Sequence, residues 1–400
     1  MAHIGFAWEI GGGLGHLANM LPVAEALRGR GHALDFALHD TTYAATMLGS
    51  RGFSYSKARA VQSSLNFAPA SYAEMLLSCG YASVAVLRPL VAYWREWLMG
   101  ATQGLLIADH APTALLAARG LPIARAMLGA GFFSPPRTTP LPRFRDWEPV
   151  DERRIADSER RVLDTINTVL AEHGTAPLTR LADLFDLDCD LLCTWPELDH
   201  YPARKPGTDY LGPILMRDSG ATPAWPQANG PRIFAYLKGN YAGLMPVVEA
   251  LRASGIAASI YLQNGSDEQY RLLTGPKLHC QREPIALNDA LAQADLVICH
   301  AGHSTVAATL LAGKPLLLLP MHAEQYIVSQ RVAALGAGLC HVPGFQPLDL
   351  PSALRQLVNK PDFRECASRF AARHTAFDPS QQSELLADRL EAVLAPSCGK

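Results

Sequence analysis

The chain has 400 residues, of which 49% are hydrophobic and 18% are charged. This composition supplies ample apolar core and argues against disorder, and the length predicts two or three domains. The formal net charge of -2 at pH 7 gives no electrostatic reason to expect a nucleic acid as partner.

The cysteines and the first residues indicate the compartment. The eight cysteines are scattered and include no Cys-x-x-Cys pair, so neither a disulfide framework nor a zinc site is indicated. The first residues, MAHIGFAWEI, contain no basic stretch, no apolar run of signal length and no small-residue cleavage site. We therefore expect a cytoplasmic protein.

The first half of the chain alternates between strand and helix patterns. Residues 3–10 predict a buried strand, after which apolar residues recur at helical spacing up to Leu27. Further strands are predicted at 32–40, 104–110 and 122–128, and a helix at 113–120. The apolar segment 71–100 is interrupted by charged residues and a proline. It predicts one or two buried amphipathic helices, with membrane association as the less favoured alternative.

A proline- and glycine-rich stretch at 201–231 predicts an interdomain linker. We place an N-terminal domain at 1–215, the linker at 216–231 and a C-terminal domain at 232–400, where the alternation restarts. A last helix at about 380–395, with Ser380 as its N-cap, is compatible with packing on either domain. Strands that alternate with helices predict an α/β fold with parallel sheets, and a ligand in the cleft between the two halves.

The turn after the first strand, GGGLGH at 11–16, raises the first question of function. It does not fit Gly-x-Gly-x-x-Gly, because His16 stands where the third small residue is required, and no Gly-Lys-Ser/Thr follows. What remains is a strand, a glycine turn and a histidine at the start of a helix.

The most specific pattern is ICHAGHSTVAATLLAGKPLLLLPMHAEQ at 298–325. A strand runs to Cys299, and a turn then leads to a helix opened by His303, Ser304 and Thr305. The free N–H groups and the positive dipole end of such a helix suit a phosphate or diphosphate. An ordinary N-cap is the alternative explanation for the serine and threonine.

This run resembles the donor-binding signature of the family 1 (UGT-type) nucleotide-sugar glycosyltransferases, His-x-Gly-x-x-Ser/Thr, Gly-x-Pro and Pro-x-x-x-Asp-Gln. The matching residues are His300, Gly302, Ser304, Thr305, Gly313, Pro315, Pro320, Glu324 and Gln325. The resemblance implies the GT-B fold, in which two Rossmann-like domains face each other across a cleft and the C-terminal one binds the donor. The acceptor region, residues 50–100 and 125–190, carries no matching motif.

The same resemblance implies a catalytic base. Members of the family carry a Gly-His in the N-terminal turn, matched here by Gly15-His16, and this histidine takes the proton of the acceptor hydroxyl as the hydroxyl attacks the sugar. A base of this kind contributes about 10²–10⁴-fold in rate. The family pairs the histidine with the aspartate of an Ala-Asp, matched by Asp109, which would hold the tautomer. A helix N-cap is the alternative role for Asp109, and His110 is a rival partner for His16.

For the donor, the resemblance assigns His300 and Thr305 to the diphosphate, and Glu324 and Gln325 to sugar hydroxyls. A hydrogen-bonded core position is the alternative for His300. His303 stands where members often have a tryptophan or a small residue. The other donor-binding candidates are Gly13, Gly15, Gly302 and Ser304.

Two departures from the family pattern leave the donor base open between UDP and dTDP. Ala308 stands where many members have the glutamate that accepts from the ribose. Of the Trp-x-Pro-Gln of plant members only Pro284 is kept, so Arg282 would have to stack on the base. The loop after the first strand of the second half could cover the diphosphate, with Gly239 allowing close approach and Lys238 supplying charge; a solvated turn is the alternative.

The leading hypothesis is an inverting glycosyltransferase that moves a sugar from a nucleoside diphosphate to a small, apolar acceptor. We expect no cofactor and no metal site, and interpret the Asp-Cys-Asp at 188–190 as the start of a strand rather than a metal motif. A lipid-directed transferase of the same fold at the membrane surface is the first alternative. A non-catalytic accessory protein of that fold is the second.

Overall fold

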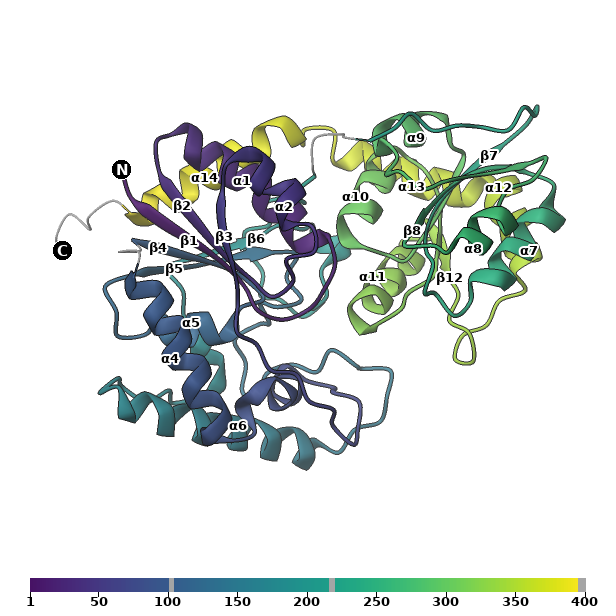
Figure 1. The fold of residues 1–400 in the computed structure, drawn as a ribbon. Coiled ribbons are helices and arrows are strands. Elements are labelled where there is room, and N and C mark those ends of the chain that lie inside the picture. The colour runs from purple at the N-terminus through teal and green to yellow at the C-terminus, as the bar shows by residue number, and fades with distance from the viewer. Residues whose placement is uncertain (101–103, 216–219, 395–400) are drawn as a thin grey trace. The chain divides into compact units, whose positions relative to one another are not determined.

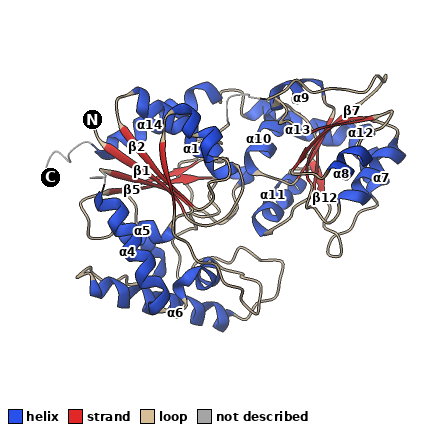
Figure 2. Ribbon diagram, in the orientation of Figure 1, coloured by secondary structure: helices blue, strands red, loops and turns tan. Residues whose placement is uncertain are grey.

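The computed structural model describes residues 1–100, 104–215 and 220–394 of the protein. Its chain divides into two compact units. The first consists of Met1–Ile214 together with the segment that begins at Pro379, and the second of Leu215–Asp378. In each unit, helices lie on both faces of a parallel sheet (Figures 1 and 2).

The first unit contains a six-stranded sheet in the order β3-β2-β1-β4-β5-β6. Its strands are β1 (His3–Trp8), β2 (Ala33–Leu38), β3 (Ser54–Lys57), β4 (Leu105–Asp109), β5 (Ala124–Gly129) and β6 (Cys189–Leu192). Its helices are α1 (Gly15–Gly29), α2 (Ala44–Met47), α3 (Tyr72–Leu76), α4 (Val84–Gly100), α5 (Pro112–Ala118), α6 (Glu152–Glu172) and α14 (Pro379–Leu394). Short helical turns are η1 (Gly49–Arg51), η2 (Leu77–Tyr81), η3 (Leu181–Phe185) and η4 (Pro196–Leu198).

The second unit contains a six-stranded sheet in the order β12-β11-β10-β7-β8-β9. Its strands are β7 (Arg232–Lys238), β8 (Ala257–Gln263), β9 (Leu278–Gln281), β10 (Leu296–Cys299), β11 (Leu316–Leu318) and β12 (Gly338–Cys340). Its helices are α7 (Leu244–Ser254), α8 (Asp267–Leu272), α9 (Leu287–Gln293), α10 (His303–Leu311), α11 (Ala323–Ala334), α12 (Leu350–Asn359) and α13 (Pro361–Arg373).

The two sheets have the same topology. Numbered within its own unit, each has the strand order 3-2-1-4-5-6 of the Rossmann fold. The order reverses between β1 and β4 in the first unit and between β7 and β10 in the second. Ligands of such sheets bind beyond the carboxyl ends of the strands at this reversal, which we call the switch point. The predicted α/β class with two Rossmann-like units is confirmed.

The apolar segment 71–100 belongs to the core of the first unit. Along α4, the buried Leu87, Val91, Trp94 and Leu98 recur at helical spacing and join the cluster beneath the sheet. Among the described residues, no single helix combines the length and the apolar character of a membrane span. The pair Tyr72–Tyr81 and Val84–Gly100 meets that criterion only when joined, and it bends by 84° between its two parts.

The last helix belongs to the first unit. Helix α14 lies beside α1 (Figure 1), and the buried amide of Gln382 donates to the carbonyls of Leu211 at 2.6 Å and Gly212 at 2.9 Å. The second unit therefore ends at Asp378, not at 400. Ser380, expected as the N-cap, lies inside the first turn. Of the predicted linker, residues 216–219 lie outside the described residues, and 220–231 belong to the second unit.

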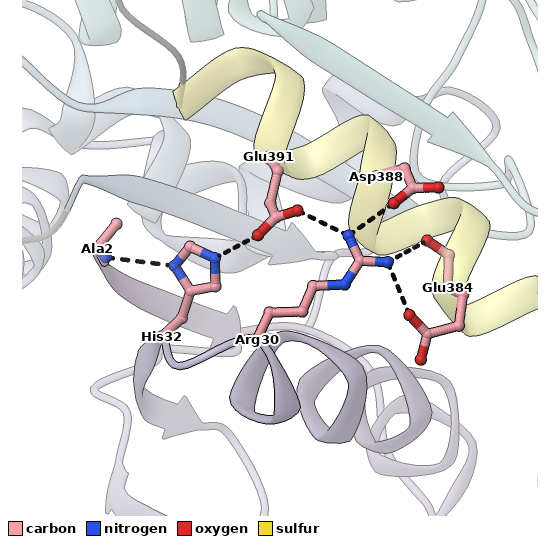
Figure 3. Close-up of polar contacts among 6 residues, drawn as sticks. All are labelled: Ala2, Arg30, His32, Glu384, Asp388 and Glu391. Atoms are coloured by element: carbon pink, nitrogen blue, oxygen red, sulfur yellow. Dashed lines mark hydrogen bonds and ion pairs between the residues drawn. The ribbon is translucent and has the colours of Figure 1, made fainter.

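A charged cluster holds α14 against the end of α1 (Figure 3). The guanidinium of Arg30 donates to Glu384, Asp388 and Glu391 at 2.6–2.7 Å, and Nε2 of His32 lies 2.8 Å from Glu391. The three carboxylates share one face of α14 because they are spaced three and four residues apart. They are largely exposed, so we expect their attraction to be modest and to weaken with salt.

Candidate active site

The glycine turn between β1 and α1 positions His16 as the second residue of α1. Gly11 and Gly13 have φ angles of 93° and 95°, which residues with side chains rarely adopt. A Cβ on Gly11 would lie 2.8 Å from Nε2 of His16, whereas one on Gly12, Gly13 or Gly15 would meet nothing within 4 Å. Glycine at position 11 therefore keeps the space beside Nε2 open.

The structure brings His16 and Asp109 together. Nδ1 of His16 lies 3.1 Å from Oδ2 of Asp109, the last residue of β4. The side chain of Asp109 is 2% exposed and that of His16 is 12% exposed. The separation is that of an ion pair, but Oδ2 has no aligned hydrogen-bond donor among the described residues. Catalytic hydrogen bonds are often loosely aligned before the substrate binds.

The alternative role for Asp109, as the N-cap of α5, is not what the structure shows. Helix α5 has Ala111 at its N-cap and no side-chain cap there. Instead, Oε2 of Glu9 accepts the backbone N–H of Thr113 at 2.8 Å. Burial raises the pKa of Glu9 to about 7, against the lowering effect of its hydrogen bonds with Thr113. Sequence reasoning missed Glu9, and its only signal was a carboxylate within an apolar run.

His110, the rival partner, lies near His16: a Cβ on Gly11 would be 2.8 Å from Nε2 of His16 and 3.7 Å from Nδ1 of His110. It is buried, and neither ring nitrogen has a hydrogen-bond partner within the described part of the chain. Burial is the main cause that lowers the pKa of His110 well below its usual range, and the nearby His16 lowers it further. The backbone of Ile10 has a smaller, opposing effect. His110 is therefore a neutral ring that leaves the Asp109 carboxylate to His16.

Aromatic rings surround the two imidazoles. Trp8 stacks on His16 with ring centroids 4.6 Å apart, and Phe133 stacks on His110 at 3.5 Å. Phe133 also lies 5.7 Å from the ring of His16. The sequence analysis singled out neither aromatic residue. Trp8 lies within the strand predicted at 3–10 and is the last residue of β1, whereas Phe133 lies in a long loop without a motif.

At the second switch point, His300 is fully hydrogen-bonded within its own unit. Nδ1 lies 2.8 Å from the carbonyl oxygen of Leu319, and Nε2 accepts the backbone N–H of Lys238 at 3.0 Å. These partners assign the proton to Nδ1. Burial lowers the pKa of His300 to about 4, so the ring is neutral at pH 7. These contacts fit the alternative interpretation of His300, a hydrogen-bonded core histidine, rather than a residue that donates a hydrogen bond to the diphosphate.

The N-terminus of α10 lies beside His300. Gly302 is its N-cap, and no side chain caps the helix. His303, Ser304 and Thr305 form the first turn, and all three are partly exposed. The first N–H groups of an α-helix lack intrahelical acceptors and attract anions. This end of α10 therefore has the properties expected of a diphosphate site.

The two residues expected to bind the sugar begin α11. Gln325 is buried, and its Oε1 accepts the backbone N–H of Met321 at 2.9 Å. Glu324 is partly buried in the same helical turn. The structure thus places both residues at one helix start, where Gln325 holds the preceding turn.

Arg282 and Pro284, the two residues expected near the nucleobase of the donor, are exposed on the surface. Arg282 already has contacts within the protein. Its guanidinium lies 4.0 Å from the ring centroid of Tyr270 and donates to Asp267 at 2.5 Å. Ala308, where many members of the resembling family have a glutamate, is a buried residue inside α10. Stacking of Arg282 on a base would therefore compete with its stacking on Tyr270.

Gly239 permits the closest backbone approach in the second unit's candidate site. A Cβ there would lie 2.5 Å from the carbonyl oxygen of Asn264 and 2.8 Å from Cα of Gly265.

Within the described ranges, no group of three or more His, Cys, Asp or Glu residues is arranged to hold a metal ion. The Asp-Cys-Asp triplet lies at the start of β6, as predicted.

Comparison with known proteins finds a family likeness over the C-terminal part of the second unit and the first residues of α14. Residues 281–382 match the model of the glycosyltransferase family 28 C-terminal domain. A PGL/p-HBAD biosynthesis rhamnosyltransferase of Mycobacterium bovis (strain BCG / Pasteur 1173P2) is 26% identical over 214 residues, which cover 52% of this chain and 47% of the relative. A UDP-N-acetylglucosamine--N-acetylmuramyl-(pentapeptide) pyrophosphoryl-undecaprenol N-acetylglucosamine transferase of Rhizobium etli is 36% identical over 112 residues, which cover 27% of this chain and 29% of the relative. The chain thus spans about half the length of the rhamnosyltransferase that it matches.

Solved structures extend the likeness to both units. The calicheamicin glycosyltransferase CalG4 superposes with a TM-score of 0.73 at 17% identity, over 100% of this chain and 99% of that one. The spinosyn rhamnosyltransferase SpnG, complexed with thymidine diphosphate, superposes with a TM-score of 0.66 at 20% identity, over 96% and 100%. Residues 281–382 are thus similar to the glycosyltransferase family 28 C-terminal domain, and the chain has the GT-B fold of these glycosyltransferase structures.

Proposed function

We propose that the protein is an inverting, metal-independent glycosyltransferase that moves a sugar from a nucleoside diphosphate to a hydroxyl of a small, apolar acceptor. The contact between His16 and Asp109 carries this proposal, because it places an imidazole on a buried carboxylate at the switch point of the first unit. The family 28 domain in the second unit supports the nucleotide-sugar donor.

In the proposed reaction, Nε2 of His16 takes the proton of the acceptor hydroxyl while its oxygen forms a bond to C1 of the sugar. The bond from C1 to the phosphate oxygen breaks, and the nucleoside diphosphate leaves with the electron pair. Attack from the side opposite the leaving group inverts the configuration at C1. Asp109 stabilises the imidazolium that forms, and the N-terminus of α1 disfavours a charged His16 before the reaction.

We favour a thymidine diphosphate sugar as the donor. The apolar Ala308 supplies no carboxylate for a ribose hydroxyl, and a deoxyribose has one hydroxyl fewer to bind. SpnG is named as a rhamnosyltransferase complexed with thymidine diphosphate, and the M. bovis relative is also named as a rhamnosyltransferase. UDP is the alternative, since the R. etli relative is named for a UDP-sugar.

The aromatic rings of Trp8 and Phe133 beside His16 support an apolar acceptor. A lipid-linked acceptor at a membrane surface is the second candidate, because the R. etli relative is named for a pyrophosphoryl-undecaprenol substrate. A cytoplasmic location forms part of both proposals.

The first test is calorimetric titration of the protein with dTDP, UDP and GDP, without added metal and then with magnesium. We expect saturable binding of dTDP without metal, which then selects the dTDP-sugars for transfer assays with hydroxylated aromatic and lipid-linked acceptors. If none of the three nucleotides binds under either condition, the enzyme proposal fails and the accessory protein becomes the better explanation.

A further inference from the structure

We propose that Lys238, rather than His300, supplies the positive charge that holds the diphosphate of the donor. This inference rests on the proposed function and assigns to one residue the main electrostatic contact of that site.

Lys238 occupies the switch point of the second unit. It is the last residue of β7, which pairs in parallel with β10, the strand that leads to His300. Its backbone N–H donates to Nε2 of His300 at 3.0 Å. Its ammonium is near enough to the ring to contribute to the lowered pKa of His300, after burial and against the Leu319 contact. The backbone of Lys238 therefore lies against the ring of His300, two residues before the N-cap of α10.

The ammonium of Lys238 is half-buried and has no counter-ion among the residues that the structure describes. Burial lowers its pKa, and burial is the one cause resolved for that shift. By contrast, Arg364 of the same unit pairs with Asp295, and Nζ of the exposed Lys277 donates to the carbonyl of Gly255. A partly desolvated charge without a partner is costly unless a ligand compensates it.

The turn after Lys238 is rigidly held. The N–H of Gly239 donates to the carbonyl of Gln263 at 2.8 Å, and its own carbonyl accepts from Nε2 of Gln269 at 2.7 Å. The N–H of Tyr241 then returns to the carbonyl of Lys238 at 3.1 Å. The backbone that carries the lysine is therefore held in place before an anion binds, so binding has to order only the side chain.

His300 is poorly suited to the same task. Both of its ring nitrogens are hydrogen-bonded within the unit, and its low pKa keeps it uncharged at pH 7. A diphosphate carries several negative charges, and charge-assisted contacts are stronger than those of a neutral ring. In this arrangement, His300 positions the backbone of Lys238, while Lys238 and the first turn of α10 bind the diphosphate.

The test compares Lys238→Met, Lys238→Arg and the matched control Lys277→Met, an exposed lysine of the same unit. Calorimetry measures the affinity for whichever of dTDP and UDP the wild-type protein binds. Ligand-observed NMR measures the affinity for the corresponding nucleoside, thymidine or uridine. We expect Lys238→Met to weaken diphosphate binding about 10- to 100-fold and to leave nucleoside binding unchanged. Lys238→Arg and Lys277→Met should stay within about threefold of the wild type.

Equal diphosphate binding by Lys238→Met and wild type would overturn this inference and leave the proposed function standing. An equal loss of nucleoside and diphosphate affinity would also overturn it, because the residue would then only support the fold. If the wild-type protein binds no diphosphate, both the inference and the proposed function fail. Should Lys238→Met not fold, Lys238→Gln serves as the uncharged variant, with the same expected loss.

Discussion

At the first switch point, an imidazole faces a carboxylate; at the second, an imidazole lies between two backbone groups. His16 begins a helix and places Nδ1 on Asp109, with the open side of Gly11 beside Nε2. His300 directly follows strand β10, and its two ring nitrogens contact the carbonyl of Leu319 and the N–H of Lys238. The two units share one topology, so the difference comes from the side chains placed on it.

The backbone itself is closely similar at the two places. The residue after Asp109 and the residue after His300 both have a positive φ, 50° for His110 and 58° for Ala301. Each lies between the fourth strand of its sheet and the helix that follows. A carboxylate partner stabilises a protonated imidazole, whereas a buried N–H donor stabilises the neutral form. The partner of the ring, rather than its place in the fold, thus favours His16 over His300 as the proposed base.

The largest expected effect is the loss of the base. His16→Ala should reduce transfer by about 10²–10⁴-fold, because no group would remain to take the proton of the acceptor hydroxyl. Nucleotide affinity should stay within about threefold of the wild type, since the donor site is assigned to the other unit. Turnover measured with saturating donor, together with calorimetry, checks both statements. Unchanged turnover would show that the His16–Asp109 contact is structural, like that of His300.

A glycine series separates the position of the base from backbone strain. Gly11→Ala combines a φ of 93° with a Cβ 2.8 Å from Nε2 of His16, whereas Gly13→Ala has a similar φ and no close neighbour. Gly12→Ala has neither problem. Transfer activity should fall by about 10-fold or more for Gly11→Ala, because the ring of His16 must shift.

Backbone strain of about 1–3 kcal/mol should lower the stability of both the Gly11 and the Gly13 variants. Gly12→Ala should match the wild type in activity and in the urea midpoint of unfolding. Equal activity losses for Gly11→Ala and Gly13→Ala would contradict a specific role for the space beside Nε2.

His300→Leu should lower stability through two groups left without partners, the N–H of Lys238 and the carbonyl of Leu319. The expected cost is about 2–4 kcal/mol near pH 7.5. The pKa of His300 is about 4 in the folded protein, below its unfolded value of 6.5, so the unfolded chain binds the proton more readily. The contribution of this ring to the unfolding free energy of the wild type is therefore fully present above about pH 6.5 and declines as the pH falls towards 4.

Urea unfolding of wild type and His300→Leu between pH 4.5 and 7.5 measures this linkage. The difference in unfolding free energy should shrink by up to about 3 kcal/mol at the acid end, because the wild type loses the contribution that the variant already lacks. A difference that is constant with pH would mean that His300 is not the buried, neutral ring described here.

The smallest effect is expected at the charged cluster that attaches α14 to the first unit (Figure 3). Arg30→Met should increase hydrogen exchange of α14 a few-fold at low salt, and the difference from wild type should shrink in high salt. Arg28→Met, two residues earlier and outside the cluster, is the control. Exchange rates that do not change in Arg30→Met would show that the buried Gln382 contacts and the apolar face of α14 suffice.

Local patterns predicted most of the fold because strands and helices leave periodic apolar residues. The alternation of 3–10, 32–40 and 104–110 with helices corresponds to β1, β2 and β4. The Gly-His and Ala-Asp pairs, through their resemblance to the family 1 glycosyltransferases, predicted the meeting of His16 and Asp109, which the structure places near the ends of the neighbouring strands β1 and β4. The return of α14 was left open, because its apolar face carries no information about which sheet it covers.

By itself, the sequence determined an α/β class with two similar halves, because strands and helices leave periodic apolar residues. The resemblance of its short motifs to the family 1 glycosyltransferases implied the two Rossmann-like domains and the roles of His16, Asp109 and the start of α10. Only the tertiary structure decided that Glu9 caps α5 and that Phe133 lies against His110. It also decided that the ring nitrogens of His300 are hydrogen-bonded to the backbone of Lys238 and Leu319. These contacts join residues far apart in the chain. Hydrogen bonds and burial act through space, so no local pattern announces which partner a buried polar group will find.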